Sequence, residues 1–374
     1  MTLIILLALG FALAYVNGAN DVSKGIATLV GGGVTNFRRA IAWGTFWTGV
    51  GGIASAFLSR AMIQTFGSGL LAPGIHASEA AALATIIGAA LWVALATMGG
   101  LPVSTTHAIV GSIAGTTALA YGVGGVNWVS LGGKIALPLL LSPIVSLILT
   151  STLLRVWSMS TAGTVNDCLC AELVQPFQAM AGSDGIVLPS PLMPGVQVAT
   201  CIASEATSPR ITLNHLHWLT SGAASFARGL NDVPKMVALL LSAALLSGTV
   251  SAIPVAYFAG IALGMVCGSW MAGQRITEVL ACEVTPMDHR EGFVANLTTA
   301  ALVGVGAALG WPMSTTHVAS GAILGIASTR KEGGNEPANY RTIRAMLVAW
   351  VVTLPVAALL GATALVLLRL TGVH

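Results

Sequence analysis

Two short polar strings each occur twice in a chain that is otherwise strongly apolar. "LPVSTTH" covers residues 101–107 and "WPMSTTH" covers 311–317. The second pair is "NGANDVSKG" at 17–25 and "RGLNDVPKM" at 228–236. Hydroxyl, amide, carboxylate and ammonium groups thus recur at matching positions, and these are the groups that hydrogen-bond small ions. The four strings are the candidate functional segments.

The first pair predicts two helix starts. Pro102 and Pro312 disfavour helical backbone at the preceding residue, and Ser104 and Ser314 are good N-cap residues. A helix start exposes unpaired backbone N–H groups and the positive end of the helix dipole. Two starts that face each other would therefore form a cradle for a tetrahedral oxyanion.

Side-chain donors would complete this cradle. They are Ser104, Thr105, Thr106, Ser314, Thr315 and Thr316. The alternative is that these hydroxyls only cap two ordinary helices, but the duplication with the His attached argues against it. His107 and His317 either pack against their neighbours or act in gating or proton transfer.

The second pair places ionisable groups in or beside apolar segments. Its polar residues are Asn20, Asp21, Lys24, Asn231, Asp232 and Lys235. An ionisable residue within a membrane segment is a functional candidate, because leaving it unpaired is costly. Carboxylate and amide oxygens suit a hard cation such as sodium. The alternative is that each Asp pairs with the Lys three positions later and only holds a helix interruption together.

Composition indicates which elements position these residues. The chain has 374 residues, of which 55% are hydrophobic and 8% are charged, and its mean hydropathy is +0.85. Soluble domains carry about 25% charged residues, so lipid is the expected solvent. The apolar runs do not alternate, which favours helices over a closed barrel. The net charge of +3 and the absence of a basic run argue against nucleic-acid binding.

We expect eleven membrane segments and a polar loop. The segments are 2–19, 41–58, 79–99, 105–121, 134–157, 212–229, 235–250, 254–272, 293–310, 316–329 and 345–369. The first is expected to be a retained helix rather than a signal peptide. Region 158–210 is too polar to span. Its Cys168, Cys170 and Cys201 match no strong zinc pattern, so no metal is expected beyond a sodium ion.

The repeated strings indicate an internal duplication. Asp232 follows Asp21 by 211 positions and Ser314 follows Ser104 by 210. We therefore divide the chain into a first transmembrane repeat (1–157), a connecting loop (158–210) and a second repeat (211–374). The predicted fold is an all-α polytopic membrane protein, in which two inverted-topology helical repeats bring broken helices together at the midplane.

Loop charges support the inverted arrangement. Arg38 and Arg39 follow the first segment, whereas the equivalent loop of the second repeat has no Lys or Arg. Arg341 and Arg344 precede the last segment, whereas loop 121–133 has no basic residue. Basic loops lie on the cytoplasmic side of membranes. We therefore expect a cell-membrane protein whose basic loops and central loop are cytoplasmic and whose termini are outside.

Together, these strings resemble the inorganic phosphate transporter (PiT) family. The likeness covers nearly the whole chain, and Glu79 and Glu291 are similar to acidic positions of that family. It implies a symporter of phosphate with sodium or protons and no other cofactor. Phosphate would lie on the two Ser-Thr-Thr strings, the cation on the Asn-Asp pairs, and His107, His317, Glu79 and Glu291 would serve in gating. The partners expected are phosphate, the bilayer and a second copy of the chain.

One departure from the family pattern concerns the coupling ion. The pattern continues from Asn-Asp-Val to Ala-Asn, whereas this chain has Ser23-Lys24 and Pro234-Lys235. An amide that could bind a cation has become an ammonium in both repeats. We therefore expect the lysines to replace one or both cations, which leaves coupling to protons or no coupling. The alternatives are that they attract the anion directly, or that they extend to a membrane interface and pair with Asp.

Three other functions are compatible with some of these features but fit them less well than phosphate symport. Sulfate has nearly the same shape as phosphate, but it cannot donate a hydrogen bond to a buried carboxylate at neutral pH. An anion channel needs a continuous pore, and inverted repeats favour alternating access instead. An enzyme is not expected, because the duplicated Ser and His lie one turn apart, as suits a symmetric binding site better than a nucleophilic triad.

Overall fold

The computed structural model describes residues 2–67, 69–160, 211–246, 254–329 and 338–373, together with three two-residue strands between 160 and 211. Most of the predicted loop 158–210, including Cys170 and Cys201, lies outside the described residues. In the loop, β2 (Leu173–Val174) pairs antiparallel with β3 (Met193–Pro194), and β1 (Cys168–Leu169) pairs antiparallel with β4 (Ile211–Thr212), which directly follows the loop.

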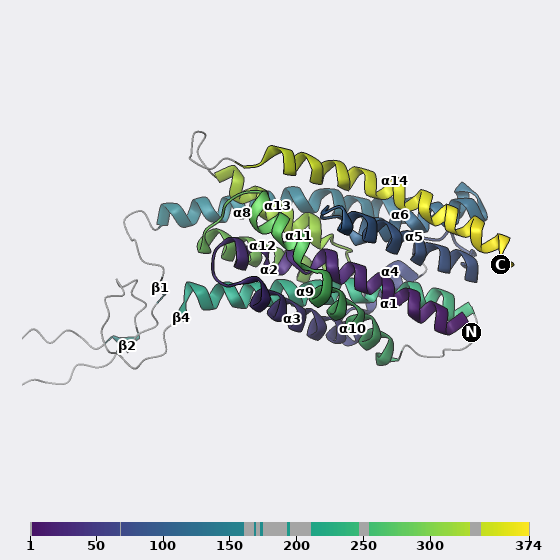
Figure 1. Cartoon of the computed structure of the whole chain (residues 1–374), viewed down its shortest axis with the longest axis horizontal. Helices are drawn as coiled ribbons and strands as arrows, with labels where there is room; N and C mark the ends of the chain where they lie inside the picture. The colour runs from purple at the N-terminus through teal and green to yellow at the C-terminus, as the bar shows by residue number, and fades with distance from the viewer. Residues whose placement is uncertain are drawn as a thin grey trace, which may run out of the picture.

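Helices make up nearly all of the described chain (Figure 1). The first repeat contains α1 (Thr2–Asp21), α2 (Ser23–Gly31), α3 (Phe37–Leu58), α4 (Arg60–Gly67), α5 (Glu79–Met98), α6 (Thr105–Tyr121), η1 (Val123–Gly125), α7 (Trp128–Ser130), η2 (Leu131–Ala136) and α8 (Leu137–Ser160). The second contains α9 (Leu213–Leu246), α10 (Val255–Ala272), α11 (Gln274–Glu278), η3 (Val279–Glu283), α12 (His289–Leu309), α13 (Thr315–Thr329) and α14 (Tyr340–Leu370).

The distribution of side chains is that of a membrane protein. Seven stretches of helix in the described residues are long and apolar enough to cross a bilayer. Large apolar side chains such as Leu140 on α8 and Val351 on α14 are exposed, whereas many Ser, Thr, Asn and charged side chains are buried. This arrangement exposes to lipid what a soluble protein would bury. The prediction of an all-α polytopic membrane protein is confirmed.

The prediction of separate segments at 212–229 and 235–250 is wrong, because α9 continues through Pro234. Proline cannot donate the hydrogen bond that the carbonyl four residues earlier would accept. Here that carbonyl belongs to Leu230, and it accepts a hydrogen bond from the hydroxyl of Ser59 at 3.0 Å instead. Ser59 lies between α3 and α4, so a tertiary hydrogen bond replaces the missing helical one and α9 continues.

The first repeat shows the opposite behaviour at the equivalent position. It has no proline there, yet α1 ends at Asp21 and α2 begins at Ser23. The carbonyl of Asn20 accepts hydrogen bonds from the Ser23 hydroxyl at 3.0 Å and from Lys24 Nζ at 2.5 Å. These side chains compete with the backbone for the acceptor, which interrupts the helical ladder beside Val22.

Helices of one repeat pack on helices of the other in matching pairs. α1 packs on α10 as α9 packs on α3, and α6 packs on α14 as α13 packs on α8. Both termini lie at one end of the molecule, and the ends of α8 and α9 that flank the central segment lie at the other (Figure 1). This exchange of partners fits a duplicated unit. The inverted insertion and its cytoplasmic side stay predictions.

Two equivalent glycines allow the helices of the Ser-Thr-Thr strings to approach their partners closely. A Cβ added at Gly111 of α6 would lie 2.4 Å from the carbonyl oxygen of Leu354, and one at Gly321 of α13 would lie 2.4 Å from that of Pro143. Neither backbone carbonyl can move out of the way cheaply. The helices that carry the Ser-Thr-Thr strings are therefore held directly against the backbones of α14 and α8.

Gly321→Ala should destabilise the protein by about 1–3 kcal/mol through overpacking, although alanine favours helix. The matched control is Gly260→Ala on α10, where an added Cβ meets nothing within 4 Å. Thermal unfolding in detergent, followed by size-exclusion fluorescence, measures both. A Gly321→Ala protein as stable as the control would contradict the close approach.

Candidate functional site

Helices α6 and α13 begin in the same way. Each follows a short extended segment, and Ser104 has extended dihedral angles of φ −88° and ψ 112°. The Ser104 hydroxyl oxygen accepts a hydrogen bond from the backbone N–H of His107 at 3.2 Å, and Ser314 accepts one from His317 at 3.2 Å. The two serines are therefore N-caps, as predicted.

The two helix starts lie against each other, and we call residues 101–107 and 311–317 the two tips. The Thr316 hydroxyl donates to the carbonyl of Val103 at 2.8 Å, and the Thr106 hydroxyl donates to that of Met313 at 3.5 Å. The rings of His107 and His317 are 4.5 Å apart between centroids. Hydroxyls of each tip thus satisfy carbonyls of the other, deep inside the protein.

Asp21 lies at the junction of both tips. Its Oδ2 accepts hydrogen bonds from Asn17 Nδ2 at 2.9 Å and from the Thr105 hydroxyl at 3.3 Å. Its Oδ1 accepts one from Thr316 at 3.3 Å and forms an ion pair with Lys24 Nζ at 2.9 Å. One buried carboxylate therefore links α1, α6 and α13.

Asp232 is bound differently. Its Oδ1 accepts a hydrogen bond from Asn231 Nδ2 at 2.8 Å and pairs with Lys235 Nζ at 3.1 Å, while its Oδ2 is buried without a partner. The Lys235 ammonium also donates to the Thr106 hydroxyl at 2.8 Å and to the Met313 carbonyl at 3.1 Å. The second Asn-Asp pair therefore contacts both tips through its lysine.

Each lysine is surrounded by oxygen atoms. Lys24 Nζ contacts the Asn20 carbonyl at 2.5 Å, Asn20 Oδ1 at 2.9 Å and Asp21 Oδ1 at 2.9 Å. Asn20 also holds the first tip, because its amide donates to the Leu101 carbonyl at 3.1 Å and its Oδ1 accepts from Val103 N–H at 3.2 Å. The ammonium groups occupy the kind of oxygen-lined place that suits a hard cation.

The structure brings most of the predicted site residues into one buried cluster. The buried members are Asn20, Asp21, Lys24, Ser104, Thr105, Thr106, His107, Asn231, Asp232, Lys235, Ser314, Thr315, Thr316 and His317. We call this set the central cluster. His317 is further held by the Leu139 carbonyl, 3.3 Å from Nδ1, and by the Trp350 ring at 4.1 Å.

Glu79 and Glu291 do not belong to the central cluster. Glu79 opens α5 behind the N-cap Ser78, and Glu291 lies in the first turn of α12, where it forms a capping box with Asp288. Each lies at the far end of a helix of about 20 residues from its tip, which corresponds to about 30 Å. A gating role for them would have to act at a distance from the tips.

Two further buried residues of the Asn-Asp strings lie beside the central cluster, and neither was predicted as a site residue. Asn17 donates to Asp21 and, at 3.0 Å, to the Thr105 hydroxyl. Arg228 is 1% exposed and donates from Nη2 to the Ser269 hydroxyl at 3.2 Å. Arg228 follows Asn17 by 211 positions, the same offset as between the Asn-Asp pairs. That shared offset was the signal in the sequence.

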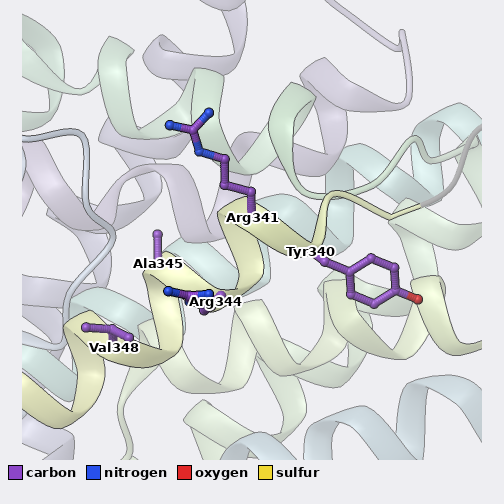
Figure 2. A pocket seen from close by; sticks show the side chains of 5 residues that line it. All are labelled: Tyr340, Arg341, Arg344, Ala345 and Val348. Carbon is purple, nitrogen blue, oxygen red and sulfur yellow. The ribbon is translucent and has the colours of Figure 1, made fainter.

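A cavity of about 510 Å³ reaches the first tip from outside the central cluster. It is lined by Gly99, Gly100, Leu101, Pro102, Arg275, Glu278, Val279, Glu283, Asn339, Arg341, Thr342, Ala345 and Met346. Arg341 also lines a second, more open hollow of about 600 Å³ on α14, with Tyr340 and Arg344. Figure 2 shows Arg341 and Arg344 projecting from the start of α14 in different directions.

The two tips and the Asn-Asp pairs lie in a part of the chain that is similar to known proteins. A model of the phosphate transporter family matches residues 17–361, which include both tips and both Asn-Asp pairs. The chain belongs to this family. The resemblance recognised in the sequence is therefore confirmed, and so is the expectation that the chain is a transporter and not an enzyme.

Curated relatives and a solved structure agree with this assignment. The chain is 27% identical to the "Putative phosphate permease" of Pyrococcus horikoshii, over 99% of this chain and 98% of that protein. It is 26% identical to "Inorganic phosphate transporter 2-1, chloroplastic" of Arabidopsis thaliana, over 95% and 70% of the two chains. The solved structure named "The sodium-dependent phosphate transporter" has the same fold, with a TM-score of 0.78, 24% identity and 99% coverage of both chains.

Asp232→Asn should destabilise the protein by about 3–5 kcal/mol, because it leaves the Lys235 ammonium buried without its counter-charge. Adding Lys235→Met removes that charge and should restore most of the loss. Thermal unfolding of the purified proteins measures both variants. Glu278→Gln, an exposed carboxylate-to-amide change, is the control and should stay within about 0.5 kcal/mol. A double variant no more stable than the single one would contradict the pairing.

Proposed function

We propose that this chain is a secondary active transporter that carries inorganic phosphate across the cell membrane, with a sodium or proton gradient as the driving force. The observation that carries the proposal is the contact between the two tips inside the protein. The names of the relatives and of the matching structure support phosphate as substrate, and the structure's name supports cation coupling.

The proposed phosphate site is formed by the starts of α6 and α13. Its donors would be the backbone N–H groups there and the hydroxyls of Ser104, Thr105, Thr106, Ser314, Thr315 and Thr316. Helix starts attract anions because their N–H groups are unpaired and the helix dipole is positive at that end. All six side chains are buried, so water competes little for these donors.

Phosphate is favoured over sulfate by an acceptor beside the tips. Asp232 Oδ2 is buried and has no hydrogen-bond partner, and its other oxygen is linked to the second tip through Asn231 and Lys235. A protonated phosphate oxygen can donate to such an acceptor, whereas sulfate cannot. A site that leaves a buried acceptor unpaired discriminates against the ligand that lacks the proton.

Lys24 and Lys235 would take the place of one or both coupling cations. Each ammonium lies among Asp, Asn, Thr or backbone oxygens that could otherwise hold sodium. We infer that coupling uses protons, or that no cation is coupled, with His107 and His317 as the groups that gate or relay protons. Repeats 1–157 and 211–374 would then move against each other around the site.

The experiment that tests this function is uptake of radiolabelled phosphate into proteoliposomes under imposed sodium or proton gradients. A transporter gives saturable accumulation that depends on a gradient, and unlabelled sulfate should compete poorly. Equilibration without accumulation would mean that no cation is coupled, and an uptake rate that then fails to saturate with phosphate would indicate an anion channel instead. Saturable accumulation of sulfate but not of phosphate would show that sulfate is the substrate, and the proposed transport mechanism would still hold.

In this assay, replacing Ser104 and Ser314 together by alanine should raise the KM for phosphate at least about tenfold. Each hydroxyl is expected to hydrogen-bond a charged ligand, and such bonds are worth about 1.5–3 kcal/mol. Ser78→Ala is the matched control, because it removes the N-cap of α5 at a helix start remote from the tips. Equal KM values for the double variant and the control would exclude the tips as the phosphate site.

The role of the two lysines is tested by the sodium dependence of phosphate uptake. Uptake by the native chain should be the same when external sodium is replaced by choline, because the ammonium groups already fill the cation positions. Lys24→Asn with Lys235→Asn frees those oxygens and should make uptake depend on sodium. The exposed Lys134→Asn is the control. Sodium-dependent uptake by the native chain that does not change in the double variant would rule out this role.

A further inference from the structure

The charges buried inside the protein do not balance. Among the side chains that the structure describes, the buried Asp, Glu, Lys and Arg residues are Asp21, Lys24, Arg228, Asp232 and Lys235. Two of these carry a negative charge and three a positive charge. Lys24 pairs with Asp21 and Lys235 pairs with Asp232, which leaves the charge of Arg228 in excess.

Arg228 has an incomplete set of partners. Its only described hydrogen bond is the one from Nη2 to Ser269, and its Nε and Nη1 are buried without any acceptor. No carboxylate of the described residues lies within ion-pair distance of it. A buried cation without a counter-ion is strongly unfavourable, so this arrangement needs an explanation in the function of the protein.

The position of Arg228 connects it to the central cluster. Ser269, its hydrogen-bond partner, donates in turn to the carbonyl of Gly18 at 3.1 Å, next to Asn17. Asn17 bonds both Asp21 and Thr105 of the first tip. The guanidinium is also attracted electrostatically to Asp21 and Asp232 without touching either. Its field therefore acts where the tips meet.

The duplication makes the excess charge specific to one repeat. The equivalent residue of the first repeat is Asn17, whose shorter side chain carries a neutral amide and bonds Asp21 and Thr105. The first repeat thus has no guanidinium at this position. The second repeat carries one additional positive charge, and the lysines of the two repeats cancel against their own carboxylates.

We propose that Arg228 supplies the fixed counter-charge of the transported anion, so that the site becomes neutral when it holds one net negative charge. This inference rests on the proposed function and names what determines specificity within it. Arg228 acts through the field at the tips rather than by touching the anion. A singly charged oxyanion, such as dihydrogen phosphate, matches the site, whereas a divalent anion such as sulfate overcompensates it.

Phosphate binding to the detergent-purified chain, measured by isothermal titration calorimetry in sodium-free buffer, tests the proposal. Arg228→Asn, which copies the residue of the first repeat, should weaken phosphate binding at least about tenfold, as expected for the loss of a charge that acts on a buried anion. Arg228→Lys keeps the charge and should bind phosphate within a few-fold of the native chain. Sulfate should bind the native chain at least about tenfold more weakly than phosphate.

Thermal unfolding separates this role from a structural one. Without phosphate, Arg228→Asn should unfold at the same or a higher temperature than the native chain, because it removes an uncompensated buried charge. With saturating phosphate, the native chain should gain more in melting temperature than the variant does. A merely structural arginine predicts the reverse, namely a less stable unliganded protein with unchanged phosphate affinity.

Each outcome has one meaning. A native chain that binds no phosphate would overturn the proposed function itself. Native binding that Arg228→Asn leaves unchanged would overturn the role of Arg228 and leave the function intact. Equal losses in Arg228→Asn and Arg228→Lys would show that charge is not what counts, and equal affinities for sulfate and phosphate would overturn the charge match.

Discussion

The contact between the two tips is the constraint on which the rest of the structure depends. The first four residues of each tip are non-helical backbone in a protein surrounded by lipid, and lipid offers no partner for carbonyl groups. The protein supplies those partners either from the tip of the other repeat or from the Asn-Asp string of the same repeat. Thr316 bonds Val103, Lys235 and Asn231 bond Met313, and Asn20 bonds Leu101. Such backbone is tolerated only because other elements bury it. The packing of α14 on α6 and of α8 on α13 provides that cover.

The same packing is built twice, but the polar interior is not. Gly111 and Gly321 make equivalent close contacts with the backbones of α14 and α8. Inside this packing, one carboxylate is bound by hydroxyls of both tips, whereas the other keeps one oxygen free. The symmetric scaffold therefore holds an asymmetric site. An asymmetric site can bind one ion in one orientation, which a perfectly symmetric cradle could not enforce.

The sequence was sufficient for the parts that depend on local rules. Duplicated strings identified the tips, the serine N-caps followed from residue type, and a spacing of three residues allowed the Asp-Lys pairs as one of two interpretations. Properties that depend on distant partners were missed. Pro234 does not end its helix because Ser59, 171 positions earlier, replaces the lost hydrogen bond. Arg228 was overlooked because its burial and its lack of a counter-ion are visible only after folding. Glu79 and Glu291 resembled family positions, but helix length places them far from the tips.

The two lysines change what such a transporter can release. A bound sodium ion leaves with the substrate, whereas an ammonium group on a helix remains with the protein. Under the proposed function, the site therefore keeps the same fixed charges before and after the anion departs. The charges of Lys24 and Lys235 are neutralised by Asp21 and Asp232. Only the charge of Arg228 would be neutralised when the anion binds and exposed again when it leaves. A small excess of fixed charge favours release as well as binding, because a site with three free cations would hold a small anion too tightly to let it go.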